Sequence, residues 1–139
     1  MTSEHRLRIP GKIEQVPKAC NWVVEVAEQM GLGMRDVNQV ELAVDEAVTN
    51  IIEHAYGGAA TNKGIDIIIN ASGAHFEVTI VDEGPKFDPL NATNPDPAAV
   101  LDDRKIGGWG VFFIKKVMDG VDYKYAANRN HLIMTKKID

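Results

Sequence analysis

Three polar side chains recur every four residues in one segment of the chain: Glu46, Asn50 and His54. At about 100° per residue in an α-helix, such positions share one face. An amide oxygen is a hard ligand that suits Mg²⁺, which usually shares its coordination shell with phosphate groups. Asn is a poor zinc ligand and the H-E-x-x-H motif is absent. The segment therefore favours a magnesium nucleotide over zinc, although the spacing alone also suits a solvated helix face.

A second cluster, Asp82-Glu83-Gly84, follows a predicted strand. An aspartate at a strand end can accept a hydrogen bond from an exocyclic amine, and a glycine two residues later lets a flat ring approach the backbone. The same D-x-G pattern also makes ordinary turns. The cluster is consistent with a site for a nucleotide base.

A third cluster places Gly107, Gly108 and Gly110 immediately before a predicted helix, with Arg104 and Lys105 just upstream. Glycines that open a helix present free N–H groups and the positive end of the helix dipole to phosphate, and two cations reinforce that field. The run matches neither G-x-x-x-x-G-K-[ST] nor G-x-G-x-x-G. It predicts a phosphate cradle, with a simple flexible connection as the alternative.

The elements that must position these clusters follow from the hydrophobic pattern. Helical spacing covers residues 13–30, 36–56 and 111–117, and strands are expected at 5–9, 65–69, 75–81, 121–126 and 131–135. Asp36 is the expected N-cap of the second helix, and a hairpin turn is expected at Ser72-Gly73. Residues 83–106 hold four of the six prolines and predict a long functional loop, in which Ala98–Leu101 could form one helical turn.

This order of elements predicts an α+β fold, a two-layer sandwich with a mostly antiparallel sheet and its helices on one face. The 139 residues are expected to form a single domain, 1–139. No strand–helix–strand alternation suggests a Rossmann domain. The single Cys20 is expected to be a packing thiol.

Composition argues against several functions. With 20 Asp and Glu against 15 Lys and Arg, the formal net charge is −5, whereas a nucleic-acid binder needs a clustered basic face. The longest apolar runs are far shorter than a membrane span, and the start MTSEHRLR lacks the hydrophobic stretch of a signal peptide. We therefore expect a cytoplasmic protein with no direct contact to nucleic acid or membrane.

Taken together, the three clusters resemble a known family. The runs DEAVTNIIEHAY (45–56), DEG (82–84) and GGWG (107–110), with MDGV (118–121), look like the ATP boxes of the GHKL ATPases, which have the Bergerat ATP-binding fold. The version is that of bacterial anti-sigma factors that are serine/threonine kinases. The resemblance covers about residues 5–138.

The resemblance implies a role for each matching residue. Glu46 would be the base near the substrate hydroxyl, Asn50 would hold Mg²⁺ and phosphate oxygens, and Asp82 would bond the adenine amine. The remaining nucleotide-binding residues would be His54, Gly84, Gly107, Gly108 and Gly110, together with Arg104 or Lys105 at the γ-phosphate. ATP and Mg²⁺ are the implied cofactors.

The implied function is phosphorylation of a serine or threonine on an antagonist protein that would otherwise displace the kinase from a sigma factor. The edge strand at 5–9 and the resemblance favour a homodimer. Three alternatives stay open: a non-catalytic ATP-binding module that sequesters a partner, the ATP-binding half of a histidine kinase, and a domain without nucleotide. Two departures from the family pattern stand out, namely Leu132 where a threonine near adenine is usual, and Lys86-Phe87-Asp88 where a second glycine is expected.

Overall fold

The computed structural model describes residues 3–57, 63–91 and 106–138. The strands are β1 (Ser3–Pro10), β2 (Gly64–Ser72), β3 (His75–Asp82), β4 (Gly120–Ala126) and β5 (Arg129–Lys137). The α-helices are α1 (Val16–Gln29), α2 (Met34–Asn50) and α3 (Ile106–Val117). Shorter turns lie at Ile13–Gln15 and Pro89–Asn91 (3₁₀) and at Ile51–Ala55 (π).

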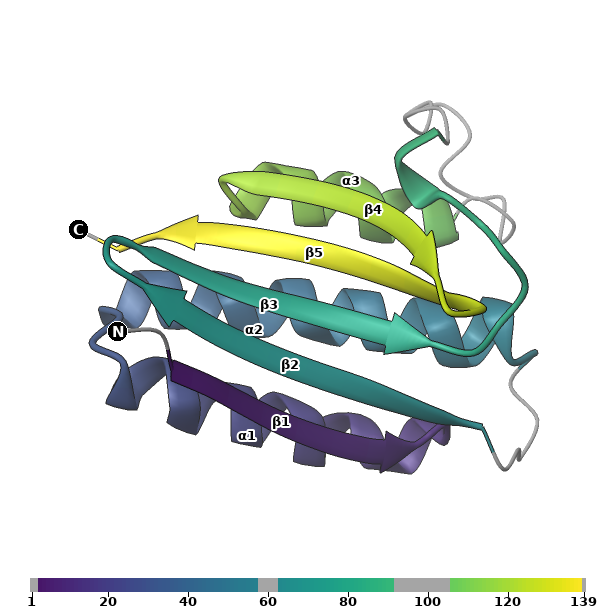
Figure 1. Cartoon of the computed structure of the whole chain (residues 1–139), viewed down its shortest axis with the longest axis horizontal. Coiled ribbons are helices and arrows are strands. Elements are labelled where there is room, and N and C mark those ends of the chain that lie inside the picture. The colour runs from purple at the N-terminus through teal and green to yellow at the C-terminus, as the bar shows by residue number, and fades with distance from the viewer. Residues whose placement is uncertain (1–2, 58–62, 92–105, 139) are drawn as a thin grey trace.

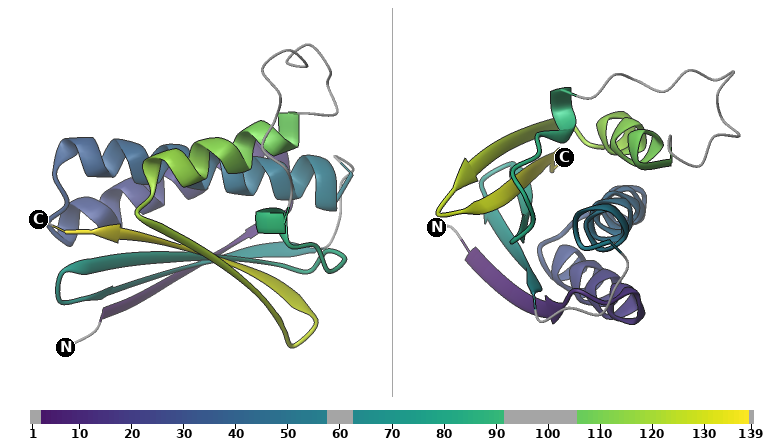
Figure 2. Two further views of the ribbon diagram at one scale, coloured as in Figure 1. Left: turned by 90° about the horizontal axis from the view of Figure 1, so that it is seen from above. Right: turned by 90° about the vertical axis from the view of Figure 1, so that its right-hand side faces the viewer.

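The strands form one antiparallel sheet in the order β1-β2-β3-β5-β4. The α-helices lie side by side on one face of this sheet, with α2 between α1 and α3 (Figures 1 and 2). None of the described helices lies on the other face (Figure 2). The predicted α+β sandwich is therefore confirmed, because the amphipathic helices have one sheet face against which to bury their apolar stripes.

The core lies between these two layers. Alternate residues of the sheet point into it, because successive side chains of a strand face opposite sides. Fully buried sheet residues include Ile9, Ile65, Ile67, Ile69, Phe76, Val78, Ile80 and Met134, and they meet Val23, Val40, Val44, Val48 and Ile114 from the helices. By register, Asp82 and its cross-strand partner Asn130 share this inner face with Ile80.

The second helix differs from its prediction at both ends. Gly33 occupies the N-cap in an extended conformation, and Asp36 lies in the first turn, where its charge complements the helix dipole. At the other end the α-helix stops at Asn50 and continues as the π turn Ile51–Ala55, closed by the Tyr56 N–H on the Ile51 carbonyl (2.9 Å). The periodicity could not show this, because the apolar stripe runs through both parts.

The third helix starts earlier than expected, at Ile106 instead of residue 111. The glycines therefore lie inside its first turns, not before them. Helix propensity is a weak prior that tertiary packing overrides, and α3 packs along α2. The possible helical turn at Ala98–Leu101 lies outside the described residues.

Two tight turns close the hairpins. Gly73 has a φ of +59° and follows the end of β2, one residue later than the predicted turn began. Between β4 and β5, Ala127 and Asn128 have φ of +54° and +62°. Two consecutive positive φ values match the right-handed twist of a two-residue hairpin, so Ala127 and Asn128 form this turn.

A buried lysine ties the helices to the sheet. Lys136 of β5 is 6% exposed, and its Nζ donates to the carbonyl of Val117 (2.6 Å) and to Oε1 of Gln39. The carboxylate of Asp36 lies 3.9 Å away. This cation satisfies the C-terminal end of α3 and holds it against the first turns of α2.

Cys20 is buried, and its burial raises the pKa of the thiol to about 12, with Asp45 and Glu41 adding to the shift. It packs without being a reactive thiolate, as expected. Within residues 3–57, 63–91 and 106–138, no helix combines the length and apolar character needed to cross a bilayer.

Candidate functional site

The α2 helix presents Glu46 and Asn50 one turn apart, both half-buried, beside a stripe of fully buried valines. Burial raises the pKa of Glu46, and the neighbouring carboxylates of Asp45 and Glu53 raise it further. A raised pKa strengthens the carboxylate as a proton acceptor. This helix face can therefore supply a base and an amide oxygen to the same ligand.

His54 follows in the π turn and is exposed. A π turn closes on i+5 instead of i+4, so residues after Asn50 leave the α-helical spacing on which the sequence argument placed His54 with Glu46 and Asn50. Its role toward a nucleotide stays a prediction. Single π turns are frequent at functional sites.

Asp82 ends strand β3 and is 7% exposed. Its Oδ1 accepts the backbone N–H of Gly84 (2.8 Å) and Nδ2 of Asn130 (3.0 Å). The first bond folds the chain sharply just after the strand. A buried carboxylate at this strand end, held through one oxygen, can receive an amine on the other.

Gly84 lies directly against the end of the helix that carries Glu46 and Asn50. A Cβ added to Gly84 would fall 2.9 Å from Cβ of Ala55 and 3.0 Å from Oδ1 of Asp82. Only glycine lets the strand end and the helix end approach this closely. The fold therefore brings the first two clusters together, as a shared site requires.

Tyr56, which the motif search did not single out as a site residue, joins the same two elements. Its hydroxyl donates to the carbonyl of Gly64 (2.8 Å) and accepts the backbone N–H of Glu83 (2.9 Å). Its ring also fills the space beside Gly11, where a Cβ would lie 2.6 Å from it. A tyrosine after a helix gives no sequence signal for these contacts, because its partners are backbone groups remote in sequence.

Charged side chains cross-link the strands behind Asp82. Arg8 pairs with Asp66 (2.9 Å) and Glu83 (3.1 Å), and Arg129 pairs with Asp66 (3.3 Å). The N–H of Gly64 lowers the pKa of Glu83, and Arg8 and Arg129 lower it further. Such exposed pairs add little stability singly, but together they join the ends of β1, β2, β3 and β5.

Sequence reasoning also missed Asn130, which is the residue opposite Asp82 in the β3–β5 ladder. Leu132, which stands where a threonine near adenine is usual in the family, pairs with Ile80 and packs against the core. The sequence shows no strand register, so it could not tell which of two residues on the same strand face meets Asp82.

The third cluster is described only in part. Gly107 and Gly108 fall in the first turn of α3, where backbone N–H groups have no partner within the helix, and Gly110 follows. Arg104 and Lys105 lie outside the described residues. The expected phosphate cradle therefore remains a prediction.

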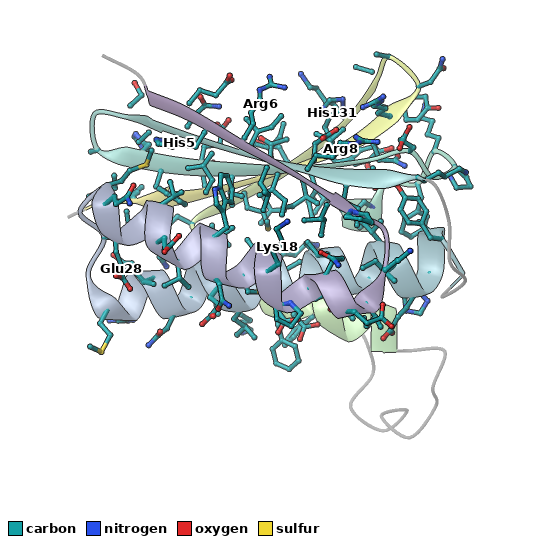
Figure 3. The ribbon with its side chains drawn as sticks, turned by 90° about the horizontal axis from the view of Figure 1, so that it is seen from below. His5, Arg6, Arg8, Lys18, Glu28 and His131 are labelled. Carbon is teal, nitrogen blue, oxygen red and sulfur yellow. The ribbon has the colours of Figure 1, made fainter. Side chains whose placement is uncertain are left out.

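A surface hollow lies elsewhere, between α1, α2 and β1. Its walls include Leu7, Lys18, Trp22, Glu28 and Met34, and none of the predicted site residues. Figure 3 shows Lys18 and Glu28 on α1, with Arg6 and His131 on the side of the sheet away from the helices. This hollow has no part in the site.

The described donors suit a hard cation better than a soft one. Among residues 3–57, 63–91 and 106–138, no three His, Cys, Asp or Glu side chains gather as a metal cluster. Mg²⁺ takes only one or two protein oxygens when it keeps water and phosphate ligands. The oxygens of Asn50 and Glu46 on one helix face fit that demand.

A sheet covered on one face by helices, with a strand-end aspartate against a helix that carries a carboxylate and an amide, defines a nucleotide-binding α+β domain. Residues 9–136 match the family model described as a histidine kinase-like ATPase domain. The chain belongs to this family. The resemblance to GHKL ATPases drawn from the three motifs is thereby confirmed.

Several curated relatives match most of this chain, and the match covers most of their own length. Serine-protein kinase RsbW of Oceanobacillus iheyensis is 32% identical over 119 residues, covering 83% of this chain and 75% of the relative. Serine/threonine-protein kinase BtrW of Bordetella bronchiseptica is 29% identical, covering 84% and 82%. RsbW of Listeria innocua is 29% identical, covering 96% and 86%.

A solved structure shares the fold. The RsbU and RsbW domains of a Mycobacterium tuberculosis protein superpose with a TM-score of 0.68 at 14% identity. The match covers 96% of this chain and 31% of that one. At this identity the likeness concerns the fold, which agrees with the sandwich predicted from the order of elements.

Proposed function

We propose that this chain is an ATP-dependent protein serine/threonine kinase of the anti-sigma type, which phosphorylates an antagonist protein. The kinase names of its relatives and its ATPase family support the activity. The observation that carries the proposal is the contact of Gly84 with Ala55. It joins the aspartate that would read the base to the helix that would meet the phosphates, so one nucleotide can span both.

At the base end, Asp82 would accept the exocyclic amine of adenine while the backbone beside Gly84 leaves room for the ring. A carboxylate accepts hydrogen bonds and donates none when ionised. It therefore favours an amine over a keto oxygen at that position. The C6 amine of adenine meets this requirement, whereas a keto oxygen at C6 does not meet it there.

At the phosphate end, Asn50 would hold Mg²⁺, with Glu46 one turn away on the same helix face. The ion, when bound, neutralises charge on the phosphate oxygens. The N–H groups of Gly107 and Gly108 would face phosphate oxygens, and Arg104 or Lys105 would steady the γ-phosphate. Phosphoryl transfer depends mainly on such positioning and charge neutralisation.

Glu46 would act as general base. It would accept the proton of the substrate hydroxyl as that oxygen attacks the γ-phosphorus, and the bond to the β-phosphate oxygen would break to release ADP. Its raised pKa matches the role, because a more basic carboxylate takes the proton more readily. Placing the half-buried Glu46 carboxylate beside Asp45 and Glu53 is unfavourable for its charge, and nucleotide binding alone does not require a carboxylate there.

The protein partners would be the antagonist substrate and a sigma factor, and the active form would be a homodimer. ATP and these partners are cytoplasmic, which places the kinase there. The net charge of −5 agrees with control of transcription through proteins instead of through nucleic acid.

The test is phosphotransfer from labelled Mg-ATP to candidate antagonist proteins of the same genome, with wild type, Glu46→Gln and Glu28→Gln. We expect Glu46→Gln to lose about 10²- to 10⁴-fold in rate with ATP affinity retained. Glu28→Gln, which changes an exposed carboxylate on α1 away from the α2 face, should keep the rate. Wild-type rates in Glu46→Gln would exclude Glu46 as base, and a wild type that binds its antagonist without transfer would favour the sequestering module.

A further inference from the structure

The side-chain amide of Asn130 has partners on both of its ends. Its Nδ2 donates to Oδ1 of Asp82 (3.0 Å) and to the carbonyls of Gly84 (3.2 Å) and Pro85 (2.9 Å). Its Oδ1 accepts the N–H of Phe87 (3.1 Å) and the hydroxyl of Tyr123. Asn130 is 6% exposed, so these partners replace water.

These partners allow one orientation of the amide only. The groups around the nitrogen are all acceptors, and the Phe87 N–H on the other side is a donor. A flipped amide would therefore set its oxygen against acceptors and its NH₂ group against a donor. Burial raises the pKa of Tyr123, with Asp88 and Asp82 adding to the shift, which keeps its hydroxyl protonated and able to donate. The Phe87 N–H and the acceptors around the nitrogen therefore fix the direction in which Asn130 meets Asp82, and the Tyr123 hydroxyl adds a hydrogen bond to that orientation.

No other side-chain type of similar size satisfies this position. Aspartate would set a second carboxylate against Asp82 and two carbonyls, and leucine would leave every partner unsatisfied. The bonds to Gly84, Pro85 and Phe87 also fix the backbone just after Asp82. One amide thus holds both the carboxylate and the chain segment beside it.

We infer that Asn130, held in this orientation by the Phe87 N–H and the Tyr123 hydroxyl, is a positioning residue that sets the base selectivity of this site. It holds Oδ1 of Asp82, already shared with the Gly84 N–H, so that Oδ2 is left to the amine of the base. Among the described residues no side chain or backbone group bonds Oδ2. The inference rests on the proposed function, because it takes Asp82 as the adenine contact.

The experiment compares ATP with inosine triphosphate, whose base carries a keto oxygen in place of the amine. Affinities are measured by calorimetry for wild type, Asn130→Ala, Tyr123→Phe and the control Tyr125→Phe. Tyr125 lies on the same strand and is 37% exposed; it is opposite Asn130 in the β4–β5 ladder, but its hydroxyl makes no hydrogen bond to the Asn130 amide. Thermal unfolding shows which variants are folded.

Wild type should prefer ATP by about 10-fold or more, the value of a hydrogen bond to a charged group. Asn130→Ala should lose most of that preference, because ATP binding weakens while binding of the inosine nucleotide stays nearly the same. Tyr123→Phe should lose part of the preference, and Tyr125→Phe none. A purely structural role would weaken both nucleotides equally and leave the ratio intact.

Two results would overturn the inference, and they differ from each other. A folded Asn130→Ala with the wild-type ratio would remove the positioning role and leave the kinase proposal standing. A wild type that binds neither nucleotide would remove the proposed function itself. If Asn130→Ala does not fold, Tyr123→Phe provides the test. An unchanged ratio of ATP to inosine triphosphate affinity in that variant would also contradict the inference.

Discussion

The two ends of the proposed site are built in opposite ways. Around Asp82, buried polar groups bond to Asn130 of β5, to the segment after β3 and to Tyr56 after the π turn, and the same bonds that shape the site also hold the sheet together. Around Glu46, a carboxylate lies half-buried near two others, and its raised pKa marks an unfavourable environment for its charge. The groups that would bind the base thus also stabilise the fold, whereas the charged form of the proposed catalytic carboxylate destabilises it.

The largest effect is expected from Asp82→Asn. The change replaces the acceptor oxygen that would meet the adenine amine, so ATP affinity should fall by about 10- to 100-fold, corresponding to the loss of a charge-assisted bond. Calorimetry measures it. Asp66→Asn is the matched control, because Asp66 bonds arginines on the outer face and should affect stability only. Wild-type affinity in a folded Asp82→Asn would contradict the base site.

A comparable effect is expected from Gly84→Ala, on both binding and stability. The new methyl group would overlap Ala55 and Asp82, and overpacking of this kind costs about 1 to 3 kcal/mol. The control is Gly120→Ala, where the nearest atom, Cβ of Thr135, lies at an ordinary 3.7 Å. Chemical denaturation and ATP titration measure the two effects. An unaltered ATP affinity would show that the strand end and helix end do not share a ligand.

Tyr56→Phe should lower the free energy of unfolding by about 1 to 2 kcal/mol, because it leaves the Gly64 carbonyl and the Glu83 N–H without their partner. For a chain of this size the melting temperature should fall by about 3 to 8 °C. Tyr125→Phe, which loses an exposed hydroxyl, should melt like wild type. Equal melting of all three proteins would mean that water replaces the hydroxyl of Tyr56.

The smallest effect has the opposite sign. A carboxyl with a raised pKa binds its proton more tightly in the folded protein than in the unfolded chain, so its charge destabilises the fold at higher pH. Glu46→Gln should therefore be slightly more stable than wild type near about pH 8, by roughly 0.5 kcal/mol. The gain should shrink as the pH falls through the raised pKa toward about 4, where the unfolded carboxyl titrates.

Melting curves at several pH values measure this difference. Glu28→Gln on α1, an exposed site away from the α2 face, serves as the control. A Glu46→Gln protein that is less stable at high pH would show that the carboxylate is held by favourable contacts. The contrast between the two ends of the site would then disappear.

Much of the fold was predictable because each element has a strong local pattern. The α2 stripe of Val40, Val44 and Val48 and the alternation in β2 are both set by burial on one side. The boundaries were less accessible, as the start of α3 at Ile106 and the π turn after Asn50 show. Those ends depend on packing between elements, which periodicity does not contain.

The site was predictable only where it follows a motif. Asp82, Gly84, Glu46 and Asn50 stand in recognisable runs, and the fold brings the Asp82 strand end to the α2 helix end. Asn130 was not found, because its importance depends on the register that sets it opposite Asp82. Register reflects cross-strand packing, which a single sequence leaves open.

The order of strands has a consequence for how the protein is made. β5 is the last strand in the chain, yet it lies between β3 and β4 in the sheet. During synthesis β3 must therefore wait with one open edge, a template for pairing with other chains, until residues 129–137 have emerged. The same insertion brings Asn130 and Lys136 into place, so the open edge of β3 is paired, the proposed base site forms and α3 is anchored in one late event.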